Sequence, residues 1–159
     1  GGTSRPARDN SRRSRRRERL CTSSEWTFAC EGEEKLPYPY GSERDPTACN
    51  IDRHYRMPDL EAFSYDDKIS SEVDRLDQRV ASGSMPRCES PFGVRDMTGN
   101  VDEWVVNERP DPENDIDISA LKGGYFGPIR ARCRPMTNSH NRWFRFYQVG
   151  FRCCADTPG

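Results

Sequence analysis

The 159-residue chain is long enough for one domain and leaves little room for a second. Only 33% of its residues are hydrophobic and 32% are charged. No apolar run approaches the ~18–20 residues that cross a bilayer, so the sequence predicts no transmembrane segment and excludes an integral membrane protein. Seven Cys, 12 Gly and 12 Pro beside so little apolar content predict a loop-rich domain held by disulfides.

A basic arm opens the chain. Residues 1–20 carry eight Arg against two acidic residues, a balance of +6, which leaves −7 for the other 139 residues. Residues 1–19 have no aromatic side chain and no aliphatic one larger than Ala, so we expect a flexible or peripheral arm, then one domain at 20–156 and a tail at 157–159. The arginines of the arm are suited to binding the phosphate groups of nucleic acid or anionic lipid. Nucleic-acid modules, however, usually interleave aromatic residues with their cations. A solvated arm, or one lying on the acidic body, is therefore favoured over a nucleic-acid partner.

A short helix is predicted directly after the arm. Thr22 and Glu25 have the spacing of a capping box, in which each side chain accepts a hydrogen bond from the backbone N–H of the other residue. Trp26 and Cys30 then fall on one face of the helix, which should be buried. The helix should end near Gly32.

A second helix is predicted over residues 67–81. Apolar residues recur there at helical spacing, namely Ile69, Val73, Leu76 and Val80. The polar run 82–84 should end it. Between the two predicted helices, residues 36–41 should be extended without forming a central strand, because Pro alternates with the aromatic residues.

Short strands and loops should make up the rest. Turn residues separate short apolar runs at 91–94, 99–101, 103–106, 121–127, 144–150 and 151–154, and strands of three to five residues are predicted in several of them. The acidic, Pro-bearing stretch 107–120 should be a surface loop.

One acidic stretch has the composition of a cation site. Asp96 and Glu103 lie on either side of the turn-forming Gly99, and Ca²⁺ favours carboxylate and backbone carbonyl oxygens together. The spacing is not that of an EF-hand. The alternative interpretation is a solvated acidic turn with Trp104 anchored in the core.

The order of several segments resembles the formylglycine-generating enzyme family, also called the sulfatase-modifying-factor domain. These segments are RLCTSSEWTFAC, YPYG, CN, FGVRDMTGNVDEW, LKGGYFGP, RCRP and VGFRCC, and they cover residues 19–155. The chain is similar to the C-terminal part of the family's longer domain. The resemblance implies an α+β fold of the irregular C-type-lectin-like kind, with short strands, one or two short helices, much coil and bound Ca²⁺.

The resemblance also implies the Ca²⁺ ligands. They are the side chains of Asp96 and Glu103 and the carbonyls of Gly99 and Val101. A second family site begins with an Asn-Ile pair, which makes Asn50 a further candidate. Where the family commonly has Trp, this chain has Asp102, which adds charge beside the site and removes an aromatic plug.

The family's catalytic centre is not matched in the sequence. Formylglycine-generating enzymes hold Cu(I) between two thiolates, five residues apart, shortly after a Gly-Gly pair. Here no Cys follows Gly123–Gly124 before Cys133, and a single soft thiolate cannot reproduce two-coordinate Cu(I). We therefore expect neither copper nor formylglycine-generating activity, and no catalytic residue. The alternative is an oxidoreductase of the same family that uses Cys133, or an unpaired Cys, on a protein thiol substrate.

Seven cysteines allow three bridges and leave one thiol. The resemblance implies a Cys30–Cys133 bridge. Because they flank the irregular middle segment, Cys49 and Cys88 are a reasonable second pair. Vicinal cysteines rarely bond to each other, so Cys21 should take Cys153 or Cys154, and we choose Cys154. The remaining Cys would pair with a missing N-terminal segment or a partner chain, in an extracytoplasmic location that is periplasmic, cell-surface or secreted.

A candidate binding surface follows the Gly-Gly pair. Arg, Tyr and Trp dominate interface energetics, and they are frequent here. The arginines at alternate positions 130, 132 and 134 suggest one face of a strand and a protein or anionic ligand. The alternative is a mixture of core aromatic residues and scattered surface cations. The candidate residues are Tyr125, Phe126, Arg130, Arg132, Arg134, Asn138, His140, Asn141, Trp143 and Phe144.

Overall fold

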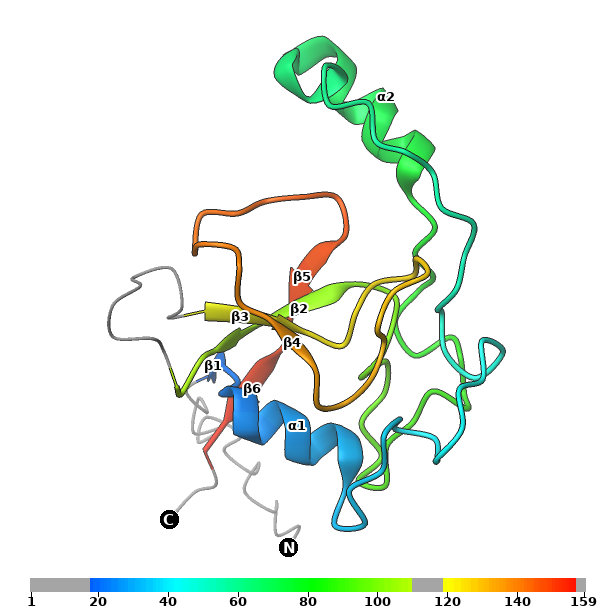
Figure 1. Ribbon diagram of the computed structural model, residues 1–159, viewed down its shortest axis with the longest axis vertical. Helices are drawn as coiled ribbons and strands as arrows, with labels where there is room; N and C mark the ends of the chain where they lie inside the picture. Colours follow the sequence, from blue (N-terminus) through cyan, green and yellow to red (C-terminus); the bar gives the residue numbers. More distant parts are fainter. Residues whose placement is uncertain (1–17, 110–118, 157–159) are drawn as a thin grey trace, which may run out of the picture.

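The computed structural model describes residues 18–109 and 119–156, and the predicted arm at 1–17 and the tail lie outside that part. Within these two ranges, two α-helices, one 3-10 helix and six short strands are joined by long coil segments (Figure 1). In chain order they are β1 (Glu18–Leu20), α1 (Ser23–Glu31), η1 (Ala62–Ser64), α2 (Asp66–Leu76), β2 (Asp102–Val106), β3 (Ser119–Lys122), β4 (Met136–Thr137), β5 (Val149–Phe151) and β6 (Cys153–Ala155). This confirms the predicted α+β fold with short strands and much coil.

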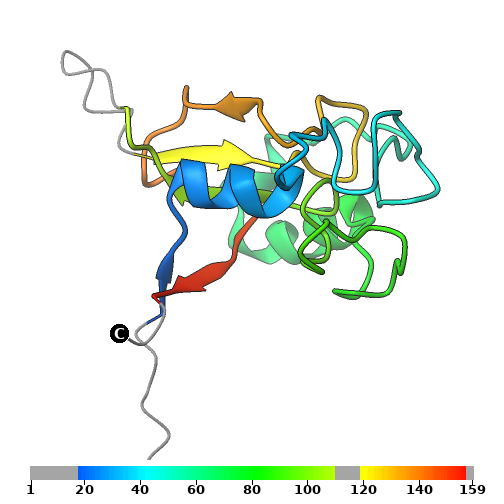
Figure 2. The same cartoon turned by 90° about the horizontal axis from the view of Figure 1, so that it is seen from below.

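The strands form two small sheets. One is the antiparallel pair β1–β6, and the other has the strand order β4-β3-β2-β5, in which only the β2–β5 pair is parallel. Figure 2 shows α1 running alongside the four-stranded sheet while the β1–β6 pair extends away from it. The main core lies between α1 and the four-stranded sheet, and it includes Trp26, Met97 and Val105, which are all fully buried.

The capping box begins α1 as predicted. The backbone N–H of Glu25 donates to the Thr22 hydroxyl, and the Glu25 carboxylate accepts from the N–H of Thr22. Trp26 and Cys30 are buried. The helix ends at Gly32, where the φ of +66° and the close approach of Pro91 both require glycine.

The second helix is shorter than predicted. It ends at Leu76 instead of continuing to 81, so the predicted final turn is wrong. Competing hydrogen bonds follow the helix: the Asp77 carboxylate accepts from the N–H of Arg79, and the side-chain amide of Asn100 accepts from the N–H of Val80 and donates to its carbonyl. The bonds from Asn100 hold Val80 outside the helix. Figure 1 shows α2 projecting from the rest of the molecule.

The boundary of the basic arm is also corrected. Glu18 and Arg19, which fall within the predicted arm, pair with Ala155 and Cys154 in the β1–β6 sheet. The Arg19 guanidinium forms ion pairs with Glu25 and Asp156. The last two arm residues are therefore part of the domain.

All three predicted disulfides are present. Cys30–Cys133 joins α1 to the segment before β4, Cys49–Cys88 lies in a second buried cluster with Ile51, and Cys21–Cys154 joins the two ends of the domain. Cys153 is a free, exposed thiol. Within the described residues, no helix is long and apolar enough to cross a membrane.

Gly99 should be intolerant of a side chain. A Cβ there would lie 2.4 Å from the Asn50 carbonyl oxygen, and its φ is +78°. We expect Gly99→Ala to lower the free energy of unfolding by about 2–3 kcal/mol, from backbone strain and overpacking together. Gly93→Ala is the matched control, since its φ is +76° with nothing within 4 Å of the added Cβ. It should lose only about 1 kcal/mol in urea unfolding, and equal losses would contradict the steric argument.

Candidate functional site

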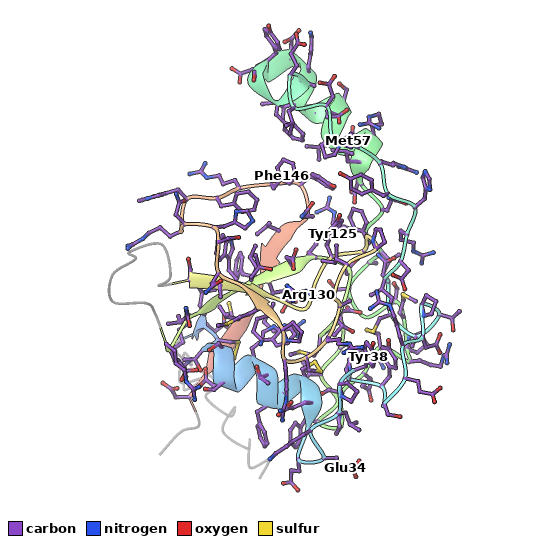
Figure 3. The ribbon with its side chains drawn as sticks, viewed as in Figure 1. Glu34, Tyr38, Met57, Tyr125, Arg130 and Phe146 are labelled. Carbon is purple, nitrogen blue, oxygen red and sulfur yellow. A yellow bond between two sulfur atoms is a disulfide. The ribbon has the colours of Figure 1, made fainter. Side chains whose placement is uncertain are left out.

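An open cavity of about 500 Å³ lies beside the Gly123–Gly124 pair. It is bounded by the ends of β2 and β3, by β4, and by the loops that follow the glycines and precede β5; Tyr125 and Arg130 mark it in Figure 3. Its lining residues are Asp102, Leu121, Lys122, Gly123, Gly124, Tyr125, Ile129, Arg130, Pro135, Met136, Thr137, His140, Phe144 and Gln148.

The two glycines let the backbone pass between the core and this cavity. A Cβ on Gly123 would lie 2.8 Å from the Met97 carbonyl oxygen, and one on Gly124 would lie 3.1 Å from Ala131. Both glycines have positive φ. The close packing brings the loop at 129–131 against β3 and so forms one wall of the cavity.

Two ionisable groups of the lining are strongly desolvated. Burial raises the pKa of Asp102 to about 7, although a hydrogen bond from the Gly124 backbone opposes the shift. Burial also lowers the pKa of Lys122 to about 8. The Lys122 ammonium is engaged away from the cavity, since it donates to the Arg134 carbonyl and lies 5.2 Å from the centre of the Trp26 ring.

The exposed Arg130 differs from these groups because its guanidinium has no hydrogen-bond or ion-pair partner among the described residues. Beside it, aromatic rings provide apolar walls. His140 stacks on Phe144 with ring centres 3.8 Å apart, and Tyr125 packs edge-on against Tyr147. The cavity therefore combines a free cation, a desolvated carboxyl group and stacked rings.

The structure brings together only part of the predicted binding surface. Tyr125, Arg130, His140 and Phe144 line the cavity. Phe126 is buried and supports Tyr125 from behind. Asn138 and Trp143 are exposed outside the lining.

The prediction that the arginines at 130, 132 and 134 lie on one face of a strand is wrong. Residues 130–134 form no strand. Arg132 instead donates to the Tyr38 hydroxyl, while Arg134 pairs with the Glu31 carboxylate. Of the three arginines, Arg130 alone lines the cavity.

Sequence reasoning did not assign Asp102, Lys122 or Gln148 to this site. A signal was present for Asp102, because residues alternate between faces of a strand. In β2 the side chains of Glu103 and Val105 are buried, whereas Asp102 lies on the opposite face and reaches the cavity.

The predicted cation ligands lie around a second cavity, of about 420 Å³. Asp96, Val101 and Glu103 line it. Asp96 accepts from the N–H of Gly83, and the Gly99 carbonyl accepts from the N–H of Val101. Arg152 also lines this cavity and donates to both oxygens of Glu103, at 2.5 and 2.6 Å. Oxygen donors are the type that a hard cation prefers, but both oxygens of Glu103 are engaged by Arg152, and the described residues contain no cluster of three or more acidic, His or Cys side chains placed to hold a metal.

Asn50, the further candidate, has a structural role. Its side-chain amide donates to the Gln78 carbonyl and to Asn100, and its oxygen accepts from Arg53. Its carbonyl accepts from the N–H of Asn100. Asn50 thus helps to fix the turn that contains Gly99.

The cysteines considered as nucleophiles do not lie in the first cavity. Cys133 is buried and disulfide-bonded, so it offers no thiolate in this state. Cys153 lies on β6, and no Cys is among the described residues that line the cavity.

Comparisons with known proteins agree with this fold. The model of the sulfatase-modifying factor enzyme 1-like domain matches residues 7–157. A crystal structure of CarF has a TM-score of 0.61 and 18% identity, covering 89% of this chain and 48% of CarF. Treponema denticola variable protein 1 has a TM-score of 0.64 and 16% identity, covering 89% of this chain and 49% of that protein. The chain thus spans about half the length of these structures, and no curated protein matches it.

Proposed function

The chain belongs to the sulfatase-modifying factor enzyme 1-like domain family, and from that premise we propose that it is a non-catalytic binding or assembly module. Its ligand site is the cavity beside Gly123–Gly124. The observation that carries the proposal is the Arg130 guanidinium on the wall of this aromatic-lined cavity, which has no partner in the part of the chain that the structure describes. An anionic group of a ligand or protein partner would supply the missing partner, in charge-assisted hydrogen bonds.

The cysteine arrangement supports a binding role over catalysis. Cys133, the first Cys after the glycines, is in a disulfide, and the described lining of the cavity has no thiol. Incubation of the pure protein with a thiol-bearing peptide should leave the thiol unchanged in mass spectrometry. Formation of an aldehyde on the peptide would contradict the proposal and favour the oxidoreductase alternative.

The anion site can be tested with small carboxylates. Propionate and 3-phenylpropionate should shift the backbone amide signals of Gly123, Gly124 and Tyr125 saturably in NMR titrations. Arg130→Gln should weaken that binding by roughly ten-fold, about 1.4 kcal/mol. Arg145→Gln is the control, since Arg145 is exposed on a neighbouring loop outside the cavity lining. Equal weakening in both variants, or no shift at the glycines, would contradict the proposal.

The proposal includes a Ca²⁺ ion held by the side chains of Asp96 and Glu103 and the carbonyls of Gly99 and Val101. The oxygen donors support it, as does the cavity that Asp96, Val101 and Glu103 share. Millimolar CaCl₂ should raise Tm by a few degrees relative to EGTA, because an ion that binds only the folded state stabilises it. Asp96→Asn should abolish the shift while tolerating the φ of +56° there. An unchanged wild-type Tm would contradict the calcium site.

Three disulfides support an extracytoplasmic location, and the exposed Cys153 thiol supports a covalent link to a partner chain. Cys153→Ser should abolish any disulfide-linked adduct in non-reducing electrophoresis. An adduct that persists in this variant would require another cysteine.

A further inference from the structure

The cavity beside Gly123–Gly124 presents two opposite charges that a simple anion would not satisfy together. Arg130 lines it from the loop after the glycines, and Asp102 lines it from the start of β2. We propose that its ligand is a zwitterion of the α-amino acid class, with the carboxylate held by Arg130 and the ammonium by Asp102. This inference rests on the proposed binding function and specifies the ligand.

Asp102 is available for a ligand because of the strand geometry. Its neighbour Glu103 lies on the opposite face of β2, where it pairs with Arg152. The Asp102 backbone N–H donates to the Gln148 carbonyl, and its side chain receives a hydrogen bond from the Gly124 backbone. No cation pairs with it among the described residues. The Asp102 carboxylate is therefore left for a ligand ammonium, which would supply the cationic partner in a charge-assisted hydrogen bond.

Lys122 does not compete with the ligand for Asp102. Its side chain is almost completely buried, donates to the Arg134 carbonyl and lies over the Trp26 ring. Arg134 is likewise paired with Glu31. The charges left facing the cavity without a charged partner among the described residues are therefore Asp102 and Arg130, one of each sign.

The two charges give the site a means of discrimination. An amine alone would leave Arg130 unpaired, and a carboxylate alone would leave Asp102 unpaired, so each incomplete ligand forgoes one charge-assisted interaction. The apolar part of the lining, with Leu121, Ile129 and Phe144, can contact a side chain. The volume of about 500 Å³ lies within the range of small-molecule sites.

The test compares matched ligands on the wild-type protein. The twenty free amino acids are screened by NMR, and calorimetry then compares phenylalanine with 3-phenylpropionate and 2-phenylethylamine, and leucine with 4-methylpentanoate and isopentylamine. At least one amino acid should bind ten-fold or more tightly than both of its analogues. Binding no tighter than that of the carboxylate analogue would overturn the inference while leaving the anion-binding function standing. No binding by any probe would overturn both.

Two variants assign the charges. Asp102→Asn should weaken amino-acid binding ten-fold or more and change binding of the carboxylate analogue less than two-fold. Arg130→Gln should weaken both and spare the amine. Each variant must retain the three disulfides and one free thiol of the wild type. If Asp102→Asn weakens the carboxylate analogue as much as the amino acid, Asp102 has only a structural role and the assignment fails.

Discussion

Replacing Glu103 by Ala is expected to lower the free energy of unfolding by about 3–5 kcal/mol, because it leaves a partly buried guanidinium without its counter-charge. The Glu103 side chain is 8% exposed and that of Arg152 is 22% exposed. Glu103 also accepts from the indole N–H of Trp26 at 2.7 Å, and Arg152 donates to the carbonyls of Arg95 and Asp96. The single carboxylate therefore joins α1, β2 and the segment before β6.

Urea unfolding in EGTA measures this effect without a contribution from bound cation. Glu89→Ala is the matched control, since its ion pair with Arg95 is exposed on both sides, at 41% and 45%. Removal of that pair should cost about 0–1 kcal/mol. If Glu103→Ala lost no more than the control, the buried ion pair would contribute little to the fold.

Removal of the Cys30–Cys133 bridge should cost about 4–5 kcal/mol, because its two cysteines are 103 residues apart and the unfolded chain would gain that loop's conformational freedom. The paired variant Cys30→Ser with Cys133→Ser also places hydroxyl groups in a fully buried core. With so small a hydrophobic core, we expect the variant to be largely unfolded at 37 °C, as measured by circular dichroism.

Cys153→Ser is the control for that experiment. It removes an exposed thiol and leaves all three bridges intact, so its free energy of unfolding should change by less than about 0.5 kcal/mol. A loss below 2 kcal/mol in the paired variant would mean that the unfolded chain is already compact, which reduces the entropic effect of the bridge.

The first helix could be predicted because its signals are local. Thr22 and Glu25 satisfy each other's backbone groups within one turn. The exclusion of Val80 from α2 could not be predicted in this way, because the hydrogen bonds that engage it come from Asn100, which is 20 residues beyond it. Periodicity indicates where a helix is possible, but it carries no information on distant side chains that bind the same backbone.

The features of the candidate site could likewise be predicted from the sequence only in part. Cysteine counting and the family resemblance together predicted the three bridges that are observed. The alternating arginines were misinterpreted because charge spacing does not reveal partners. Tyr38 and Glu31 engage Arg132 and Arg134, and both partners lie more than 90 residues earlier in the chain. Asp102 was noted only as a departure from the family. Its place on the cavity wall depends on how β2 pairs in the sheet, which decides the face on which Asp102 lies.

The Cys21–Cys154 bridge has a mechanical consequence. It joins the strand that begins the described domain to the strand that ends it, and those strands also pair with each other. Tension applied to the two ends of the chain would pass through this covalent link and bypass α1, the four-stranded sheet and both cavities. Such a domain can stand between tethered neighbours and keep its cavities intact under load, for as long as its surroundings stay oxidising.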